Sequence, residues 1–305
     1  MKKLFHPWCA AFFVAASLLP LTPSTTLAAD KLPVVASFSI LGDLVQVVGG
    51  DRVAVTTLVG ADQDAHVFQP KPTDAKNLLQ SKLLVTNGLG FEPWAQKLAK
   101  SAGYKGAVVV AAQGIASRTS PPEKPNAKPE ADPHAWQNPN HVAVYVRNIA
   151  QALTQLEPAS ASLFKTNSEA YIAELQILDT WAKAQFAAVP VQQRKVITSH
   201  DAFGYFAAHY QVTFLAPQGL STEGEPSAKQ VAQLIRQIKA EKIKAVFVEN
   251  MSNPKLLAQL AKDAGVTPGA ALYADALSAA DKPGASYLKM MRHNVSALSA
   301  GMQQN

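Results

Sequence analysis

The sequence predicts an α/β fold made of two (β/α)4-like lobes with parallel sheets, joined by one long backbone helix. Short apolar runs alternate with longer stretches of helical periodicity on both sides of a long helical segment, and each run is bounded by Gly or polar residues. Each connection between runs is long enough for a crossover helix, as parallel strands require.

The first lobe is expected over residues 30–138 and follows this alternation closely. Its strands are expected at residues 32–38, 52–59, 82–86 and 106–110, and its helices at residues 40–48, 73–80 and 91–102. Residues 117–132 hold four prolines and no apolar periodicity, so an exposed loop is expected there.

One long connecting helix is expected over residues 139–188, where apolar residues recur at helical spacing. Pro158 interrupts this pattern and can break or kink the helix, because proline lacks the backbone N–H. The second lobe is expected over residues 189–305. Its strands are expected at residues 195–198, 212–215, 245–248 and 271–273, and its helices at residues 202–210, 227–240, 254–264 and 287–300.

Residues 1–29 have the layout of a secretory signal peptide. Lys2 and Lys3 precede an apolar stretch over residues 8–21, and small residues end the segment at Ala29. The apolar stretch is shorter than the ~20 residues that span a bilayer. We therefore expect a cleaved signal and a soluble product exported to a bacterial periplasm.

Composition excludes several classes of protein. The chain has 305 residues, a formal net charge of +6 and one cysteine. A single Cys cannot form a disulfide within the chain, and Cys9 precedes most of the apolar stretch, unlike a lipid-attachment cysteine. No block of five Lys or Arg is present, so nucleic acid is not an expected partner.

Four side chains with metal-binding chemistry follow predicted strands. His66, His134, His200 and Asp275 each come after the end of a different strand. Ligand sites in open parallel sheets gather outside the carboxyl ends of the strands, so facing edges would bring these four together. Three imidazoles and one carboxylate suit a tetrahedral Zn²⁺ site, whereas Mn²⁺ favours more oxygen ligands.

The stretches around these residues resemble a known family. DAHVFQPKPTD, DPHAWQNP and TSHDAFGYF surround the three histidines, and the later GEPSAKQVAQLIRQIKAEKIKAVFVEN and YADALS segments extend the match. Together they resemble the metal-binding periplasmic solute-binding proteins of ABC importers, the zinc and manganese cluster, over essentially the whole chain after residue 29.

The resemblance implies both the ligands and the role. By position it implies that His66, His134, His200 and Asp275 hold the metal, and His200 places the chain with the zinc-binding subset, because manganese-binding members resemble a pattern with Glu there. It implies capture of Zn²⁺ for an ABC permease and its ATPase. A periplasmic metallochaperone is a further candidate partner, and a monomer is expected.

Three alternatives remain open from the residues. Mn²⁺ or Fe²⁺ could be the cargo of the same kind of protein, since tight zinc binding does not identify the physiological metal. A zinc-dependent hydrolase would need an open coordination position and a general base, and the sequence has no HExxH motif. A surface adhesin has no support in these residues. The chain is therefore not expected to be an enzyme.

Overall fold

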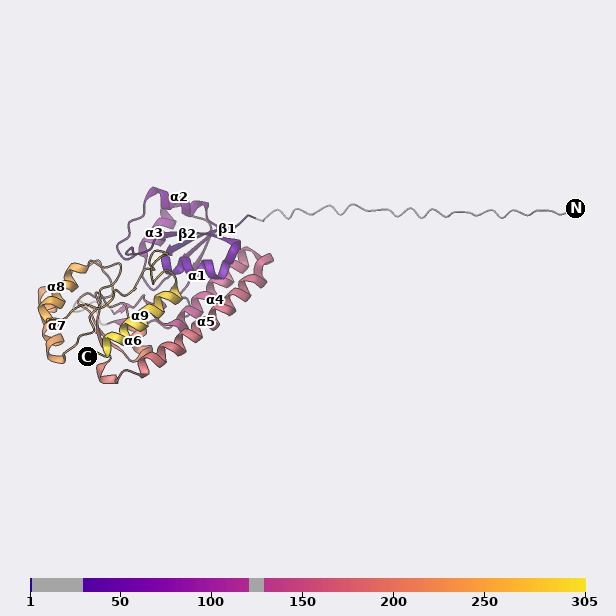
Figure 1. Ribbon diagram of the computed structural model, residues 1–305. Helices are drawn as coiled ribbons and strands as arrows, with labels where there is room; N and C mark the ends of the chain where they lie inside the picture. The colour runs from indigo at the N-terminus through magenta and orange to yellow at the C-terminus, as the bar shows by residue number, and fades with distance from the viewer. Residues whose placement is uncertain (2–29, 121–128) are drawn as a thin grey trace. The chain divides into compact units, whose positions relative to one another are not determined.

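A parallel sheet of four strands, in the order β2-β1-β3-β4, organises the first part of the chain (Figure 1). The computed structural model describes Met1, residues 30–120 and residues 129–305, so the predicted signal peptide lies outside the described residues apart from Met1. The strands are β1 (Leu32–Phe38), β2 (Val53–Val59), β3 (Leu83–Thr86) and β4 (Ala107–Val110). The central strands β1 and β3 are apolar runs that helices cover, which explains why they lack a polar alternation.

Three helices make the crossovers of this sheet: α1 (Ser39–Gly49), α2 (Pro72–Gln80) and α3 (Pro93–Ala102). Both α2 and α3 begin with Pro, whose missing N–H costs nothing at the first helical position. The α/β fold class with parallel sheets is thus confirmed.

The region from residue 189 to the C-terminus has less regular sheet structure than predicted. Strands β7 (Lys195–Ile197) and β8 (Thr213–Leu215) pair in parallel. The predicted strands at 245–248 and 271–273 appear only as isolated parallel bridges, Ile197 with Val246 and Glu249 with Leu272. The segment at 245–248 therefore runs beside β7, and the segment at 271–273 runs beside Glu249, without forming continuous ladders.

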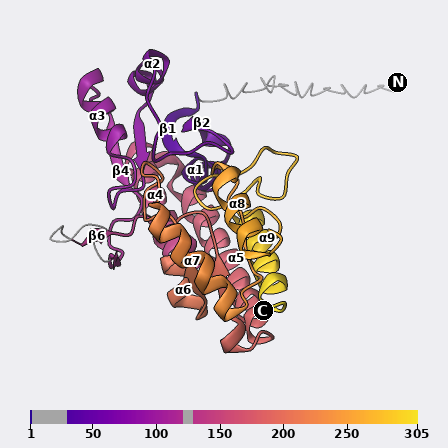
Figure 2. The same ribbon diagram turned by 90° about the vertical axis from the view of Figure 1, so that its left-hand side faces the viewer.

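Four helices accompany these segments: α6 (Gly204–Tyr210), α7 (Ala228–Glu241), α8 (Pro254–Ala264) and α9 (Tyr287–Met302). Helices α7 and α8 pack against each other (Figure 2). Ser227 begins α7 with a capping box, in which its hydroxyl accepts from the backbone N–H of Gln230.

The single helix expected over residues 139–188 is a pair of helices. Helix α4 (Pro139–Leu156) ends before Pro158, and α5 (Ala161–Ala187) begins after a short 3₁₀ turn. Glu157 leaves the helical region with φ −137° and ψ 75°, as expected for a residue that precedes proline. Helices α4 and α5 lie side by side and both pack on α1 (Figure 1). The periodicity was correct, but the chain reverses direction at Pro158.

The proline-rich segment is not wholly a loop. Strands β5 (Thr119–Ser120) and β6 (Glu130–Ala131) form a short antiparallel pair at its two ends. Residues 121–128 between them lie outside the described residues. The pair brings residue 118 next to residue 132, two positions before His134.

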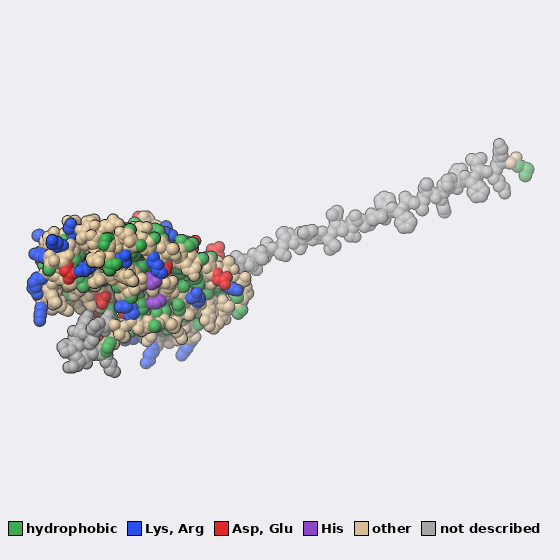
Figure 3. Space-filling view, turned by 90° about the horizontal axis from the view of Figure 1, so that it is seen from below, with side chains coloured by type: hydrophobic (Ala, Val, Ile, Leu, Met, Phe, Trp, Pro, Cys, Tyr) green, Lys and Arg blue, Asp and Glu red, His purple; other side chains and the backbone are tan. Residues whose placement is uncertain are grey.

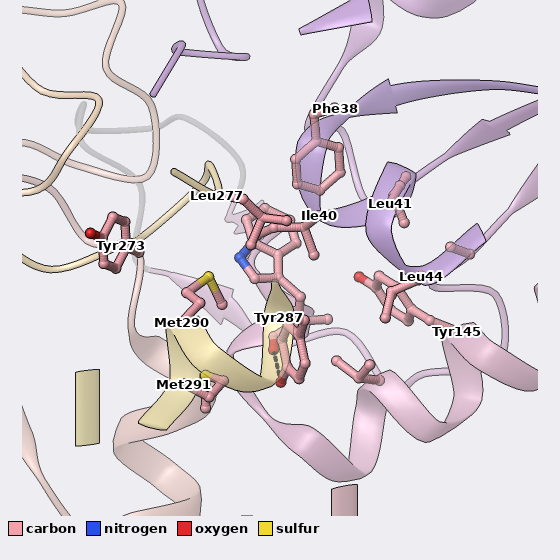
Figure 4. Close-up of a cluster of buried hydrophobic side chains, with 14 of the residues drawn as sticks. Phe38, Ile40, Leu41, Leu44, Tyr145, Tyr273, Leu277, Tyr287, Met290 and Met291 are labelled. Atoms are coloured by element: carbon pink, nitrogen blue, oxygen red, sulfur yellow. Dashed lines mark hydrogen bonds between the residues drawn. The ribbon is translucent and has the colours of Figure 1, made fainter. Parts of the chain in front are cut away.

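Residues 31–305 form one compact unit with a large hydrophobic core, and a smaller separate cluster of buried residues lies around α7 and α8. Figure 4 shows where α1 meets α9 in this core. The labelled side chains include Ile40, Leu41 and Leu44 of α1 and Tyr287, Met290 and Met291 of α9. On the face drawn in Figure 3, basic and acidic side chains are interspersed with neutral ones. Within the described ranges, no helix combines the length and apolarity needed to cross a membrane.

Candidate metal centre

The structure brings together all four residues singled out in the sequence. His66 lies in the loop after β2, His134 lies just before a 3₁₀ turn (Ala135–Gln137), His200 follows β7, and Asp275 follows the bridge at Leu272. One nitrogen of each histidine and a carboxylate oxygen of Asp275 lie within 4.8 Å of one another. His66 and His200 follow the carboxyl ends of the parallel strands β2 and β7, whereas His134 follows β6 of the short antiparallel pair.

Asp275 is the centre of the cluster. Its Oδ2 lies 3.1 Å from His200 Nε2 and 3.2 Å from His66 Nε2, and its Oδ1 lies 3.6 Å from His134 Nε2. Three of the four residues are fully buried, and His66 is 8% exposed. None of the three Nε2 atoms nor either oxygen of Asp275 has a regular hydrogen-bond partner among the described residues. Five unsatisfied polar atoms facing one another would be costly to bury unless a further group joins them.

Two of the histidines contact a carboxylate through Nδ1, the ring nitrogen that does not face the cluster. His134 Nδ1 lies 2.9 Å from Asp132 Oδ1, and His200 Nδ1 lies 2.5 Å from Glu249 Oε2. A carboxylate at Nδ1 fixes the tautomer whose Nε2 lone pair is free for a metal. Glu249 and Asp132 are therefore positioning residues for His200 and His134, and the order of the predicted strands did not indicate Asp132.

A signal for Asp132 was present in the sequence. Asp64 and Asp132 both stand two residues before a histidine, and in each case Oδ1 accepts the histidine's backbone N–H, at 2.8 Å for His66 and 3.0 Å for His134. This repeated turn presents each imidazole to the cluster. Recognising the shared D-x-H spacing would have identified both aspartates as positioning residues.

The charges of the cluster are strongly coupled. Burial alone would lower the pKa of His200, but the carboxylates of Glu249 and Asp275 raise it well above its usual value. Burial would likewise raise the pKa of Asp275, but His200 and His134 hold it well below its usual range. Without metal, the neighbouring carboxylates therefore favour the protonated form of His200. A metal ion must displace that proton to bind.

Aromatic side chains surround the cluster on the side of the first sheet. The ring centroid of Phe91 lies 4.8 Å from that of His66, and that of Trp136 lies 5.3 Å from that of His134. These rings keep water away and lower the local dielectric, which strengthens the attraction between a cation and Asp275.

The other histidines do not join the cluster. His209 bonds to Asp179, His293 bonds to the carbonyl oxygen of Ala271, and His141 packs against the ring of Tyr205.

Comparison with known proteins identifies the family. Residues 34–301 match the family model described as zinc-uptake complex component A, periplasmic. The chain is 30% identical over 275 residues to the manganese-binding lipoprotein MntA of Halalkalibacterium halodurans, covering 90% of each chain. It is 31% identical over 297 residues to the iron ABC transporter substrate-binding lipoprotein MtsA of Streptococcus pyogenes serotype M1, covering 95% of this chain and 96% of that one.

Solved structures show the same fold. The periplasmic zinc binding protein TroA from Treponema pallidum matches with a TM-score of 0.84 and 26% identity, over 90% of this chain and 99% of that chain. The Mn-bound periplasmic metal binding protein from Candidatus Liberibacter asiaticus matches with a TM-score of 0.79 and 28% identity, over 89% of this chain and 100% of that chain. The fold and the buried cluster define a metal-binding solute-binding protein.

The chain belongs to the periplasmic zinc-uptake component family of ABC importers. It is therefore the metal-binding component of such an importer, which implies a permease and an ATPase as partners. Members of this family are substrate-binding transport proteins rather than enzymes. Its relatives are named for manganese, zinc and iron, so membership alone does not select the metal.

Proposed function

We propose that this chain captures Zn²⁺ through His66, His134, His200 and Asp275 and delivers it to its ABC permease. The observation that carries the proposal is the set of five buried, unpartnered polar atoms converging on one point. Metal–ligand bonds of about 2.0–2.2 Å in a tetrahedron place neighbouring ligand atoms about 3.3–3.6 Å apart. The distances from Asp275 to the three histidines, 3.1 and 3.2 Å from Oδ2 and 3.6 Å from Oδ1, lie close to this range.

The donor set supports zinc over the alternatives. Three nitrogen donors and one carboxylate favour Zn²⁺, while Mn²⁺ prefers oxygen-rich sites of higher coordination number. Mn²⁺ and Fe²⁺ remain the second candidate cargo because relatives carry those names. Metal analysis of the protein isolated from its native periplasm distinguishes them: zinc at one equivalent supports the proposal, and manganese or iron at that level overturns the choice of metal.

The same donor set supports transport over hydrolysis. Four protein ligands would fill a tetrahedral sphere and leave no position for the metal-bound water that a zinc hydrolase needs. We therefore propose that the chain has no enzymatic activity.

The location and organisation are proposed together. Residues 1–29 are removed as a signal peptide, and the protein acts in the periplasm as a monomer, with a metallochaperone as a candidate donor of metal. Residues 30–138 and 189–305 are the two lobes, linked through residues 139–188.

Removing one ligand tests the assignment. In His200→Ala, loss of one of four ligands is expected to weaken Zn²⁺ binding at least 100-fold, measured by competitive titration against a chelator of known affinity. His209→Ala is the matched control, because His209 bonds to Asp179 away from the cluster. Unchanged affinity in His200→Ala would refute the ligand set.

A further inference from the structure

The four proposed ligands are not anchored equally. His134 and His200 are each held at Nδ1 by a buried carboxylate, from Asp132 and Glu249 respectively. Asp275 is held through the preceding carbonyl oxygen of Ala274, which accepts two buried hydrogen bonds. Against these three, the His66 ring is positioned mainly by its backbone turn and by its contact with Phe91.

His66 is also the ligand that faces the outside. It is the most exposed of the four, at 8%, and it borders a cleft of about 500 Å³ whose lining includes Glu130 and Glu223. A metal ion that enters through this cleft meets His66 first, and one that leaves through it passes His66 last.

The turn that carries His66 is fastened at several points. The side chain of Trp94 donates to the carbonyl oxygen of Ala65 at 2.8 Å. At the base of the turn, Asp62 accepts from the side chain of Asn250 at 2.8 Å.

Next to His66, one side chain connects this turn to the second half of the chain. Asp64 uses Oδ1 to accept the backbone N–H of His66 at 2.8 Å, and its Oδ2 accepts from Thr222 Oγ1 at 2.7 Å. Both residues are half-buried. One carboxylate therefore orients a proposed ligand and also accepts a hydrogen bond from a residue 158 positions further along the chain.

We infer that Asp64 and Thr222 form a latch that positions His66 over the cluster and limits the rate at which metal leaves. This inference rests on the proposed function and adds to it two positioning residues. With the latch closed, the His66 imidazole completes the coordination sphere. With it open, the tip of the turn moves toward the cleft while Trp94 and Asn250 keep the rest of the turn in place.

The test removes the hydroxyl donor without changing side-chain size. Thr222→Val is expected to release Zn²⁺ roughly ten-fold faster, because a hydrogen bond to a charged carboxylate is lost. The association rate should change less than about two-fold, since affinity differences among related variants lie mostly in dissociation. Release is measured by stopped flow from the zinc-loaded full chain into excess chromophoric chelator.

Three further measurements separate positioning from a general structural defect. Thr222→Ser keeps the hydroxyl and should restore slow release, and Ser221→Ala, whose hydroxyl bonds within its own loop, should behave like the wild type. Amide hydrogen exchange of the metal-free Thr222→Val protein should rise at residues 63–67 and remain unchanged in the core.

Each outcome decides one question. Wild-type release from Thr222→Val, no rescue by Thr222→Ser, or exchange that rises throughout the chain overturns the latch while leaving the proposed function standing. A wild-type protein that binds no equivalent of Zn²⁺ overturns the proposed function and the latch with it.

Discussion

Replacing Glu249 by Gln probes how a residue outside the cluster controls metal binding. Glu249 is buried, its Oε2 lies 2.5 Å from His200 Nδ1, and its Oε1 accepts the backbone N–H groups of Ser199 and His200 at 2.8 and 3.1 Å. Glu249→Gln keeps the shape but exchanges one acceptor for an NH₂ donor. If the amide oxygen stays with the backbone, the NH₂ group faces His200 Nδ1, which loses its acceptor.

Two effects of this change act in opposite directions. Loss of an outer carboxylate weakens metal binding 10–100-fold, which is about 1.4–2.7 kcal/mol. The same carboxylate raises the pKa of His200 in the metal-free protein, so its loss lowers that pKa and relieves competition from the proton. Below the raised pKa, each pH unit costs the wild type about ten-fold in zinc affinity.

The pH dependence of zinc affinity therefore separates the two effects. The loss of zinc affinity in Glu249→Gln, relative to the wild type, should be largest above the pKa of His200 and should become smaller as the pH falls. At pH 7, zinc binding to the wild type should release about one proton from His200, and binding to the variant should release less. Calorimetry in buffers of different ionisation enthalpy measures the proton count, and competitive titration from pH 5.5 to 8.5 measures the affinities.

The matched control is Glu241→Gln, which alters a surface carboxylate paired with Lys195. It should leave both the affinity and the proton count unchanged. A deficit for Glu249→Gln that is the same at every pH, or a proton count equal to that of the wild type, would contradict the assignment of the imidazolium to His200.

Two further changes test the surroundings of the site. A Cβ at Gly204 would lie 2.4 Å from Asp132 Oδ2, so Gly204→Ala should displace Asp132 from His134 and weaken zinc binding about ten-fold or more, measured by competitive titration. Gly224→Ala is the control and should bind zinc normally, because a Cβ there meets open space. Equal zinc affinity in the two variants would refute this. Burial raises the pKa of Glu92 from 4.5 to about 7, so the folded state binds this proton more tightly than the unfolded state does. The free energy of unfolding should therefore fall by roughly 3 kcal/mol as the pH rises from 4.5 to 7. Glu92→Gln should remove this loss. In urea unfolding of the metal-free proteins, the stability of the variant relative to the wild type should rise between pH 5 and 8, and a stability difference independent of pH would refute the prediction.

The site was more predictable than the sheets that build it. His66 and His200 follow parallel strands, whose carboxyl ends are the usual place for ligand sites, but it was the resemblance of the surrounding motifs to a known family that implied the complete set of four. Asp132 escaped notice because its role depends on a two-residue turn rather than on strand order.

The elements that the sequence did not predict depend on long-range contacts or on too few residues to produce a pattern. Helical periodicity does not reveal direction, so the reversal at Pro158 that sets α4 beside α5 could not be distinguished from a kink. Strand pairing depends on long-range partners, and at 245–248 and 271–273 the apolar runs found only single bridges. The pairing of β5 with β6 rests on two residues in each strand, too few to produce a pattern.

The anchoring of Asp275 bears on how metal is released. Trp136 Nε1 and Gln137 Nε2 donate to the carbonyl oxygen of Ala274 at 2.9 and 2.8 Å, which ties Asp275 to the segment that follows His134. Moving residues 30–138 and 189–305 apart as rigid bodies would break both bonds and leave buried groups unsatisfied, at about 1–3 kcal/mol each. Moving the tip of the His66 turn breaks one half-buried bond, between Asp64 and Thr222. The local movement therefore costs less, and a permease that contacts the cleft beside His66 could favour it without separating the two halves.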